Sequence, residues 1–209
     1  AQKEEAVLLA IKAGLESGKS VRALEFSKED DEEFVKPAQF ITDKPVMYVC
    51  NVDEGSAATG NSYVEKVREA VKDENAEILV LAVGTEADIN ELEDYEERQM
   101  FLQDIGLDEP GSSKLIRAAY KLLNQQTYFT AGVKEVRAWT VDVGATAPQA
   151  AGVIHTDFEK GFIRAEVIGY DDFSSYGSEV KVKEAGKMRV EGKNYIVKDG
   201  DVMHFLFNV

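Results

Sequence analysis

The sequence predicts two folds in series, an α/β segment followed by an α+β domain in the last third of the chain. Two continuous apolar runs, at 46–50 and 78–83, flank a helical pattern at 63–72, which is the strand–helix–strand order of a parallel α/β sheet. From residue 127 onward, short β-prone runs surround one stretch of helical spacing. Hairpin, helix, strand and further short strands is the order of a β-grasp (ubiquitin-like) domain.

Residues 1–17 predict a helix with one apolar stripe. The stripe consists of Ala6, Leu9, Ala10, Ala13 and Leu15. A lone helix of this length is marginal in water, so we expect it to pack against another element. Ser27 is the expected N-cap of a second helix, which has acids in its first turn and carries Phe34 and Val35.

Two more helices are expected before the α+β domain. An acidic helix covers 86–105 and ends at Gly106, a residue suited to the left-handed C-cap position. A helix with one apolar face covers 114–124, and Ser112 or Ser113 is its expected N-cap.

The last third alternates strands with one helix. Residues 136–142 alternate apolar and polar side chains, as a half-buried strand does. Residues 144–152 are mostly small and include Pro148, which predicts a loop. Residues 155–162 have helical spacing and 163–168 alternate again, which predicts a helix and then a strand.

Length and composition fit a soluble globular protein. The 209 residues are 44% hydrophobic and 30% charged. No apolar run approaches the ~20 residues of a membrane span, so no membrane partner is expected, and the first residues lack a signal-peptide pattern. The chain has no initiator Met, so we expect it to start inside a longer protein. Its single cysteine, Cys50, fits a reducing compartment, and the expected location is the cytoplasm.

Charge is unevenly distributed. The net charge is −15, from 24 basic and 39 acidic residues, but residues 124–209 hold 10 basic and 12 acidic residues. Most of the excess negative charge therefore lies earlier in the chain. An acidic surface repels nucleic-acid phosphates, which argues against DNA as a partner and favours the near-neutral last third as a face for RNA.

A phosphate-binding loop is suggested by Gly18-Lys19-Ser20, which has the ending of such a motif. The full pattern needs a glycine five positions before Gly18, and Ala13 stands there. A helix is also expected before it, where the motif requires a β-strand. We therefore interpret these residues as a polar turn that closes the first helix. A chain without this loop cannot hold a triphosphate and its Mg²⁺ in the usual way.

Neither histidine is a predicted catalytic base, and we assign no catalytic residue. His155 begins the helical stretch, where Thr156 or Asp157 is the expected cap, and a capping or packing role is favoured for the histidine. His204 is expected on the exposed face of the final strand. Two histidines and one cysteine without clustered spacing predict no metal site.

Several segments of the last third resemble the TGS domain that ends the YchF/Obg-like ATPases, a branch of the P-loop GTPases related to translation factors. These segments are YFTAG (128–132), EVRAW (135–139), HTDFEKGFIRA (155–165), NYIVKDGD (194–201) and FLFN (205–208). The resemblance extends through most of the chain and is weakest before Leu24. It implies that residues 1–26 end a coiled-coil arm, 27–123 form the C-terminal part of a nucleotide-binding (G) domain, and 124–209 form the TGS domain. The other helix of the arm would precede residue 1.

Residues 51–54, Asn-Val-Asp-Glu, follow the first apolar strand at its carboxyl end, where ligands bind in open α/β sheets. They resemble the YchF version of the motif that recognises the nucleotide base. Glu54 stands where most GTPases have the Asp that reads guanine, and in this family that change accompanies acceptance of ATP. The resemblance implies that Asn51 braces the loop and reaches the base, and that Val52 packs on its face. An ordinary polar loop is the alternative.

Ala82-Val83-Gly84, after the second apolar strand, matches the companion loop, whose backbone N–H would touch the base. Val83 departs from the small-residue pattern of that loop. The resemblance thus implies a base site formed by two loops at one edge of the sheet.

An RNA-binding face is suggested in the last third by basic residues interleaved with aromatic ones. The basic residues are Lys134, Arg137, Lys160 and Arg164, and the aromatic residues are Tyr128, Trp139 and Phe162. The alternative is that the aromatic side chains fill a small core while the charges solvate its rim.

The resemblance implies that the full-length protein hydrolyses ATP or GTP with Mg²⁺ and associates with the ribosome through RNA, protein or both. This chain lacks the phosphate-binding loop, so we expect no hydrolysis and no tightly bound nucleotide. The alternative is a stand-alone, non-enzymatic TGS module that binds RNA or protein. Two strands do not make a stable sheet alone, so self-association through an open sheet edge is a further expectation.

Overall fold

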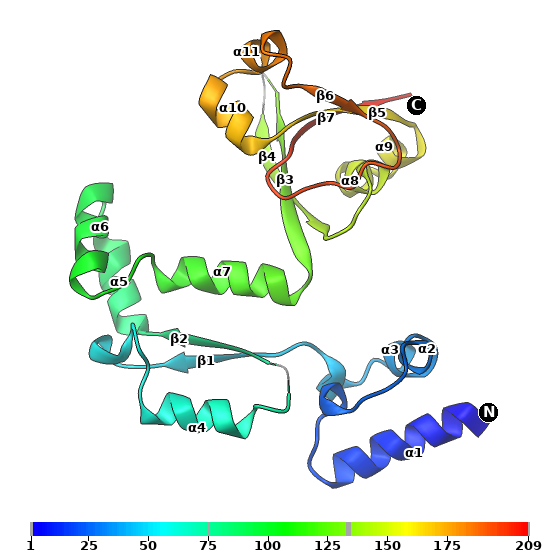
Figure 1. Ribbon diagram of the computed structural model, residues 1–209, viewed down its shortest axis with the longest axis vertical. Helices are drawn as coiled ribbons and strands as arrows, with labels where there is room; N and C mark the ends of the chain where they lie inside the picture. Colours follow the sequence, from blue (N-terminus) through cyan, green and yellow to red (C-terminus); the bar gives the residue numbers. More distant parts are fainter. Residues whose placement is uncertain (1, 75, 133–134, 209) are drawn as a thin grey trace. The chain divides into compact units, whose positions relative to one another are not determined.

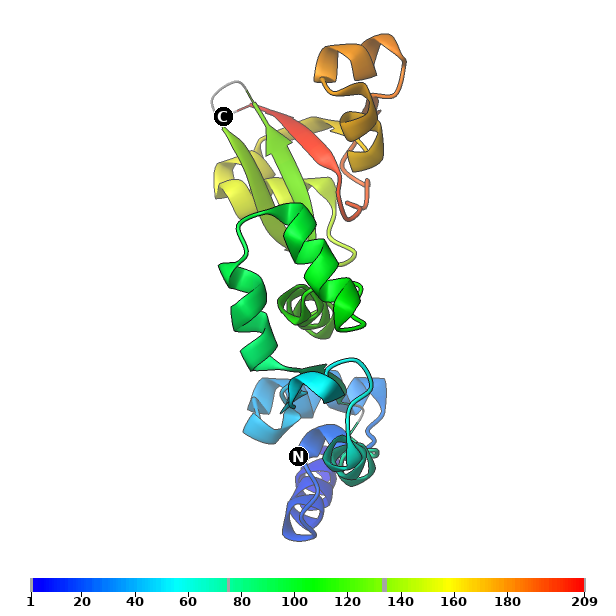
Figure 2. The same cartoon turned by 90° about the vertical axis from the view of Figure 1, so that its left-hand side faces the viewer.

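The computed structural model describes residues 2–74, 76–132 and 135–208. The chain divides into two compact units, Ala1–Leu122 and Leu123–Val209. Each unit combines helices with a β-sheet, so the fold is mixed α/β (Figures 1 and 2). No helix in the described part of the chain is long and apolar enough to cross a membrane.

The first unit begins with helix α1, Gln2–Glu16, whose buried face consists of Val7, Ile11 and Gly14. The predicted stripe is wrong, because Leu9 is 58% and Leu15 is 41% exposed. Helix α1 has apolar residues on more than one side, and its packing partner selects the face. Residues 21–40 supply that partner through the buried side chains Val21 and Val35, with Leu24, Phe26, Phe34 and Phe40 packed around them.

The segment after α1 is helical where it was predicted to be. Helix α2, Lys28–Asp30, starts behind Ser27, whose hydroxyl accepts the Asp30 N–H at 3.1 Å, which confirms the predicted cap. A wider π-helical turn follows at residues 31–35, and α3, Lys36–Ala38, completes the segment.

Strands β1, Met47–Asn51, and β2, Glu77–Leu81, are parallel and are joined by helix α4, Ser62–Ala70. This confirms the predicted strand–helix–strand order. Continuous apolar runs are typical of buried strands, but full burial is not observed here, because β1 and β2 pair only with each other among the described residues, and Val49 is 46% exposed. Self-association through the open edges stays a prediction.

The single acidic helix predicted over 86–105 is wrong. Two helices stand there, α5, Val83–Glu91, and α6, Tyr95–Asp104. The chain breaks because the Asp94 carboxylate accepts the N–H groups of Glu96 and Glu97, at 2.7 and 3.1 Å, and so starts a new helix. The C-cap prediction is confirmed, since Gly106 has φ 73° and directly follows the last turn of α6.

Helix α7, Gly111–Leu122, starts before either serine that was expected to cap it. The Glu86 carboxylate of α5 accepts the N–H groups of Gly111 and Ser112 instead. The serine-cap prediction is therefore wrong, because a side chain 25 residues away in sequence takes that role.

The second unit has one sheet with strand order β4-β3-β7-β5-β6. Strands β3 and β7 are parallel, and the other neighbours are antiparallel. The strands are β3, Gln125–Ala131; β4, Val136–Asp142; β5, Phe162–Ile168; β6, Arg189–Glu191; and β7, Val202–Phe207. Figure 1 shows them in green, yellow, orange and red.

Helix α8, Ala147–Ile154, occupies the segment that was predicted to be a loop. Pro148 lies in the first turn, where a helix needs no backbone N–H, and Ala is a strong helix former. Ala147, Ala150 and Ala151 are fully buried, and the Tyr128 hydroxyl donates to the Ala150 carbonyl at 2.8 Å. The small side chains therefore mark a close helix–sheet contact, not a loop.

Helix α9, Thr156–Lys160, has His155 as its N-cap. The His155 Nδ1 accepts the Asp157 N–H at 3.2 Å, which confirms a capping role for the histidine. The expectation that Thr156 or Asp157 caps this helix is wrong.

Helices α10, Tyr170–Tyr176, and α11, Glu179–Glu184, complete the second unit. Fully buried Val182 of α11 packs with Ile168 and Val202 in a second, smaller cluster of this unit. His204 lies exposed on β7, as predicted.

Candidate functional site

The loops that follow β1 and β2 lie side by side in the first unit. The strands are parallel and Asn51 pairs with Leu81, so both carboxyl ends lie at one edge of the sheet. The Val52 N–H extends this contact by donating to the Leu81 carbonyl at 2.8 Å. Residues 51–54 and 82–84 are thus brought together; we call them the base loops.

Asn51 joins the two base loops. Its side-chain oxygen accepts the Val83 N–H at 3.1 Å. This hydrogen bond agrees with the bracing role that the resemblance implies for Asn51, while contact with a base stays a prediction. Because the Val83 N–H is bonded to Asn51, the predicted contact between a backbone N–H of this loop and the base is left to the neighbouring residues. Helix α5 starts at Val83, so the N–H groups of Gly84 and Thr85 lie in its first turn and have no acceptor within the helix.

The remaining base-loop residues divide between core and solvent. Ala82 is buried, and half-buried Val52 packs against its cluster, so Val52 anchors the first loop. Glu54 begins a short 3₁₀ turn and is exposed. The Asp53 carboxylate accepts the Ser56 hydroxyl at 3.0 Å, which fixes the turn that carries Glu54.

This arrangement offers one carboxylate acceptor and a set of backbone donors at a sheet edge. Such groups can read the polar edge of a planar base. Within residues 2–74, 76–132 and 135–208 there is no group of three His, Cys, Asp or Glu side chains that could hold a metal ion. Both histidines lie in the second unit, so the base loops contain no histidine base.

Gly18-Lys19-Ser20 closes α1, as the sequence predicts. The Lys19 N–H donates to the Gly14 carbonyl and the Gly18 N–H to the Leu15 carbonyl, both at 3.0 Å. Gly18 has φ 82°, so these bonds form a Schellman C-cap. The backbone here is engaged in ending a helix.

The basic residues of the second unit do not form one face. Paired antiparallel residues share a face, so Arg137 lies on the face of Thr130 and Tyr128. Arg164 lies on the opposite face, that of Phe129. Lys160 is exposed at the end of α9, and Lys134 lies outside the described residues.

The aromatic residues are divided as well. Tyr128 and Phe162 are buried in the core, which confirms the alternative reading for them. Half-buried Trp139 donates its indole N–H to the Thr130 hydroxyl, and the Arg137 guanidinium stacks over its ring at 4.1 Å from the centroid. Among the members of the predicted set that the structure describes, this cation–π pair keeps an aromatic residue and a basic residue together.

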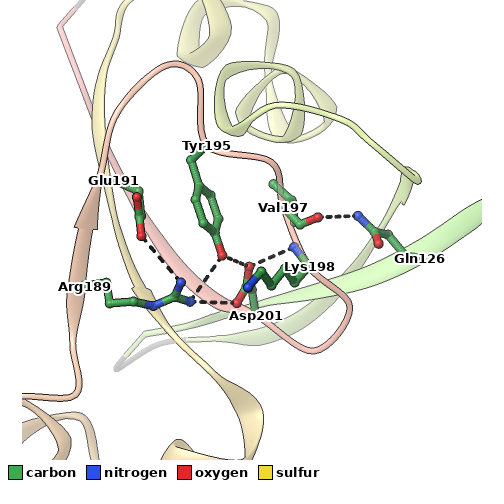
Figure 3. A network of polar contacts seen from close by, with 7 residues as sticks. All are labelled: Gln126, Arg189, Glu191, Tyr195, Val197, Lys198 and Asp201. Atoms are coloured by element: carbon green, nitrogen blue, oxygen red, sulfur yellow. Dashed lines mark hydrogen bonds and ion pairs between the residues drawn. The ribbon is translucent and has the colours of Figure 1, made fainter.

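A polar network surrounds the buried carboxylate of Asp201 near the end of the second unit (Figure 3). Asp201 is 2% exposed and accepts the Tyr195 hydroxyl at 2.7 Å, the Lys198 N–H at 2.9 Å and an Arg189 N–H at 3.3 Å. Burial, together with the bond to Asp201, raises the pKa of Tyr195 to about 12. All members of the network are paired within the fold, so the NYIVKDGD segment has a structural role in this unit.

Local patterns in the sequence do not reveal the contact of Glu86 with α7. A capping search looks a few residues ahead of a helix, whereas Glu86 precedes Gly111 by 25 residues. The sequence holds one signal of such a contact: neither Pro110 nor Gly111 has a side chain that could cap the start of a helix.

Known proteins resemble both units. A family model named YchF-GTPase_C, described as a protein of unknown function (DUF933), matches residues 125–208. The "Ribosome-binding ATPase YchF" of Escherichia coli O157:H7 is 56% identical over 209 residues, which is 100% of this chain and 57% of that protein. The Bacillus subtilis (strain 168) protein of the same name is 50% identical over 205 residues, 97% of this chain and 56% of that protein.

A solved structure shows the same fold. The Schizosaccharomyces pombe YchF GTPase matches with a TM-score of 0.82 and 31% sequence identity, over 98% of this chain and 55% of that one. The chain thus spans little more than half the length of the relatives it matches, and both of its units are included in the match. On these similarities, the chain belongs to the YchF family.

Proposed function

We propose that this chain is part of a protein that binds and hydrolyses ATP or GTP with Mg²⁺ and associates with the ribosome in the cytoplasm. Within it, the first unit carries the base-recognition half of the nucleotide site. The names of the relatives, ribosome-binding ATPase and GTPase, support this assignment. The observation that carries it is the hydrogen bond from the Val83 N–H to the Asn51 side chain, which joins two loops at the carboxyl ends of parallel strands.

Each base-loop residue has a role in this proposal. Glu54 accepts from the exocyclic amine of adenine, or from the N–H groups of guanine, through its exposed carboxylate. The first-turn N–H groups of α5, beginning at Gly84, donate to the base. Asn51 and Val52 hold the first loop in place, while Ala82 and Val83 hold the second.

We further propose that the chain does not hydrolyse nucleotide by itself. Gly18-Lys19-Ser20 forms a helix C-cap, and no nucleotide is expected to bind tightly without a phosphate-binding loop. Residues 1–26 are proposed to end a coiled-coil arm, and exposed Leu8, Leu9 and Leu15 of α1 support this role. Residues 27–123 are proposed as the C-terminal part of the nucleotide domain.

Residues 124–209 are proposed as a TGS domain with a β-grasp fold. The five-stranded mixed sheet and helix α8 on the Tyr128 side support this. The pair of exposed Arg137 and half-buried Trp139 favours RNA as a contact, because such a pair can stack on an unpaired base. Arg164, Lys160 and Lys134 stay secondary candidates.

A titration of the ¹⁵N-labelled chain tests the base site. Millimolar ATP is expected to shift the amide signals of residues 51–54 and 82–84, and inorganic triphosphate is not. An Asn51→Ala variant is expected to lose the ATP shifts while it stays folded. Shifts that triphosphate reproduces, or that lie outside the base loops, would contradict the proposal.

Co-sedimentation with ribosomes separates the proposal from a stand-alone RNA- or protein-binding module. The module hypothesis requires ribosome binding that is independent of nucleotide. An Arg137→Ala variant is expected to weaken binding, and a Lys193→Ala variant, which removes one exposed positive charge elsewhere in the same unit, serves as its control. An equal loss of ribosome binding in both variants would mean that Arg137 contributes only its positive charge.

A further inference from the structure

Helix α7 begins on a carboxylate that belongs to α5. The Glu86 side chain accepts the Gly111 N–H at 2.6 Å through Oε1 and the Ser112 N–H at 2.9 Å through Oε2. These are the first two N–H groups of α7, which have no acceptor within their own helix. Bonds from both oxygens of one carboxylate fix the helix start in direction as well as in position.

Packing holds the same helix start from a second side. Gly111 is buried, and a Cβ on it would overlap the Leu81 side chain and lie 2.9 Å from Glu86 Oε1. Leu81 is the last residue of β2 and is 7% exposed. The start of α7 therefore lies in close contact with the end of the strand.

These two contacts flank the second base loop. Leu81 immediately precedes the loop Ala82–Gly84, and Glu86 follows this loop within the first turn of α5. The backbone N–H of Glu86 donates to the Ala82 carbonyl at 3.0 Å. The N-terminus of α7 thus holds the residue before the loop and a residue after it. Asn51 holds the loop itself through the Val83 N–H.

We propose that Glu86 is a positioning residue for the nucleotide base. By holding the N-terminus of α7, it fixes the first turn of α5 and so the direction of the Gly84 and Thr85 N–H groups. The inference rests on the proposed function of the base loops, to which it adds a residue outside the motif. Loss of the carboxylate leaves two helix donors unpaired and allows this turn to open.

Hydrogen exchange tests the positioning without any nucleotide. In a Glu86→Gln variant, the amides of Val83, Gly84 and Thr85 are expected to exchange about threefold to tenfold faster, the effect of weakening a charged contact at a helix N-terminus. The same amides are expected to exchange faster in Glu86→Ala than in Glu86→Gln, because glutamine retains one oxygen acceptor. Glu91→Gln, which neutralises an exposed carboxylate of the same helix, is the matched control and should match the parent chain. Faster exchange at Gly111 and Ser112 alone would overturn the proposal.

An ATP titration of the same variants separates the two proposals. If the parent chain binds ATP at the base loops and Glu86→Gln binds about threefold or more weakly, both are supported. If the parent chain binds and Glu86→Gln binds equally well, the positioning role fails while the proposed function stands. If the parent chain shows no ATP-dependent shift, the proposed function fails and the positioning role fails with it. Circular dichroism confirms that each variant is folded.

Discussion

The two units of the chain are stabilised in different ways. Among its described residues, the second unit has one cluster of twelve buried residues that joins its sheet to α8, with a smaller cluster against α11. The described part of the first unit has two separate clusters of five and four buried residues. Small clusters bury little apolar area each, so polar contacts between distant segments, such as that of Glu86 with α7, contribute a larger share.

This difference indicates which unit can stand alone. The second unit buries its core within residues 123–209, and the family model matches nearly the same range. The first unit has a two-stranded sheet with half-exposed strands, which by itself is a marginal structure. We therefore expect the second unit to be the more stable of the two.

A core truncation in the second unit gives the largest expected effect. Tyr128 is fully buried, and its hydroxyl bonds to α8, so Tyr128→Ala is expected to cost about 3–5 kcal/mol. The chain has one tryptophan, Trp139, which lies in this unit, so its fluorescence in urea follows the second unit only. Val136→Ala, at a residue 73% exposed on β4, should stay within about 0.5 kcal/mol. Equal effects of both changes would mean that this cluster does not hold the unit together.

A glycine substitution gives the next largest effect and acts on the first unit. Gly111→Ala places a Cβ against Leu81 and Glu86, so a cost of about 1–3 kcal/mol is expected. Gly84→Ala, also at a helix start but with open space around it, should be neutral or stabilise by about 0.5–1 kcal/mol. Far-UV circular dichroism should record the difference, and Trp139 fluorescence should not. A matching fluorescence change would show that the two units unfold together.

Local patterns in the sequence predict the elements that local interactions form. The strand–helix–strand order of β1, α4 and β2 follows from continuous apolar runs, and Ser27 and Gly106 mark helix ends by capping chemistry that spans a few residues. The loops at residues 51–54 and 82–84 are adjacent because parallel strands place their carboxyl ends together. That adjacency is predictable from the sequence alone.

The predictions that fail depend on partners distant in sequence. The buried face of α1 is chosen by residues 21–40, and the start of α7 by Glu86. The small residues at 144–152 suggest a loop when they are considered alone. In the fold they allow α8 to approach the sheet closely. None of these contacts has a fixed spacing, so periodicity could not reveal them.

The Asp201 network provides a smaller test within the second unit. Tyr195→Phe removes the donor that lies 2.7 Å from the buried Asp201 carboxylate, and a loss of about 1–2 kcal/mol is expected. Tyr176→Phe, at a tyrosine of α10 that is 37% exposed, is the control and should have no measurable effect. Urea unfolding followed by Trp139 fluorescence measures both. An unchanged midpoint for Tyr195→Phe would show that another donor replaces the hydroxyl.

The smallest expected effect concerns a polar contact that links three segments of the first unit. Glu74 Oε2 accepts from the Arg22 guanidinium at 2.6 Å and from the Tyr48 hydroxyl at 2.9 Å. The guanidinium first, and then the hydroxyl, lower the pKa of Glu74 from its ordinary 4.5. A lowered pKa in the folded state means that the contact stabilises the first unit fully above that ordinary value. This contribution is lost as the pH falls through the lowered, folded-state pKa.

Glu74→Gln should therefore destabilise the first unit at neutral pH by about 1 kcal/mol or less, since the pair is partly open to solvent. The gap between the variant and the parent chain should narrow below pH 4.5, because the parent carboxyl then becomes protonated and loses its charge. Glu91→Gln, at an exposed site of the same unit, is the control for the loss of one carboxylate. Thermal unfolding followed by circular dichroism at several pH values measures the gap. If it stays constant down to the pH at which the whole unit unfolds, the hydroxyl and guanidinium bond equally well to a neutral side chain, and charge is not what joins these segments.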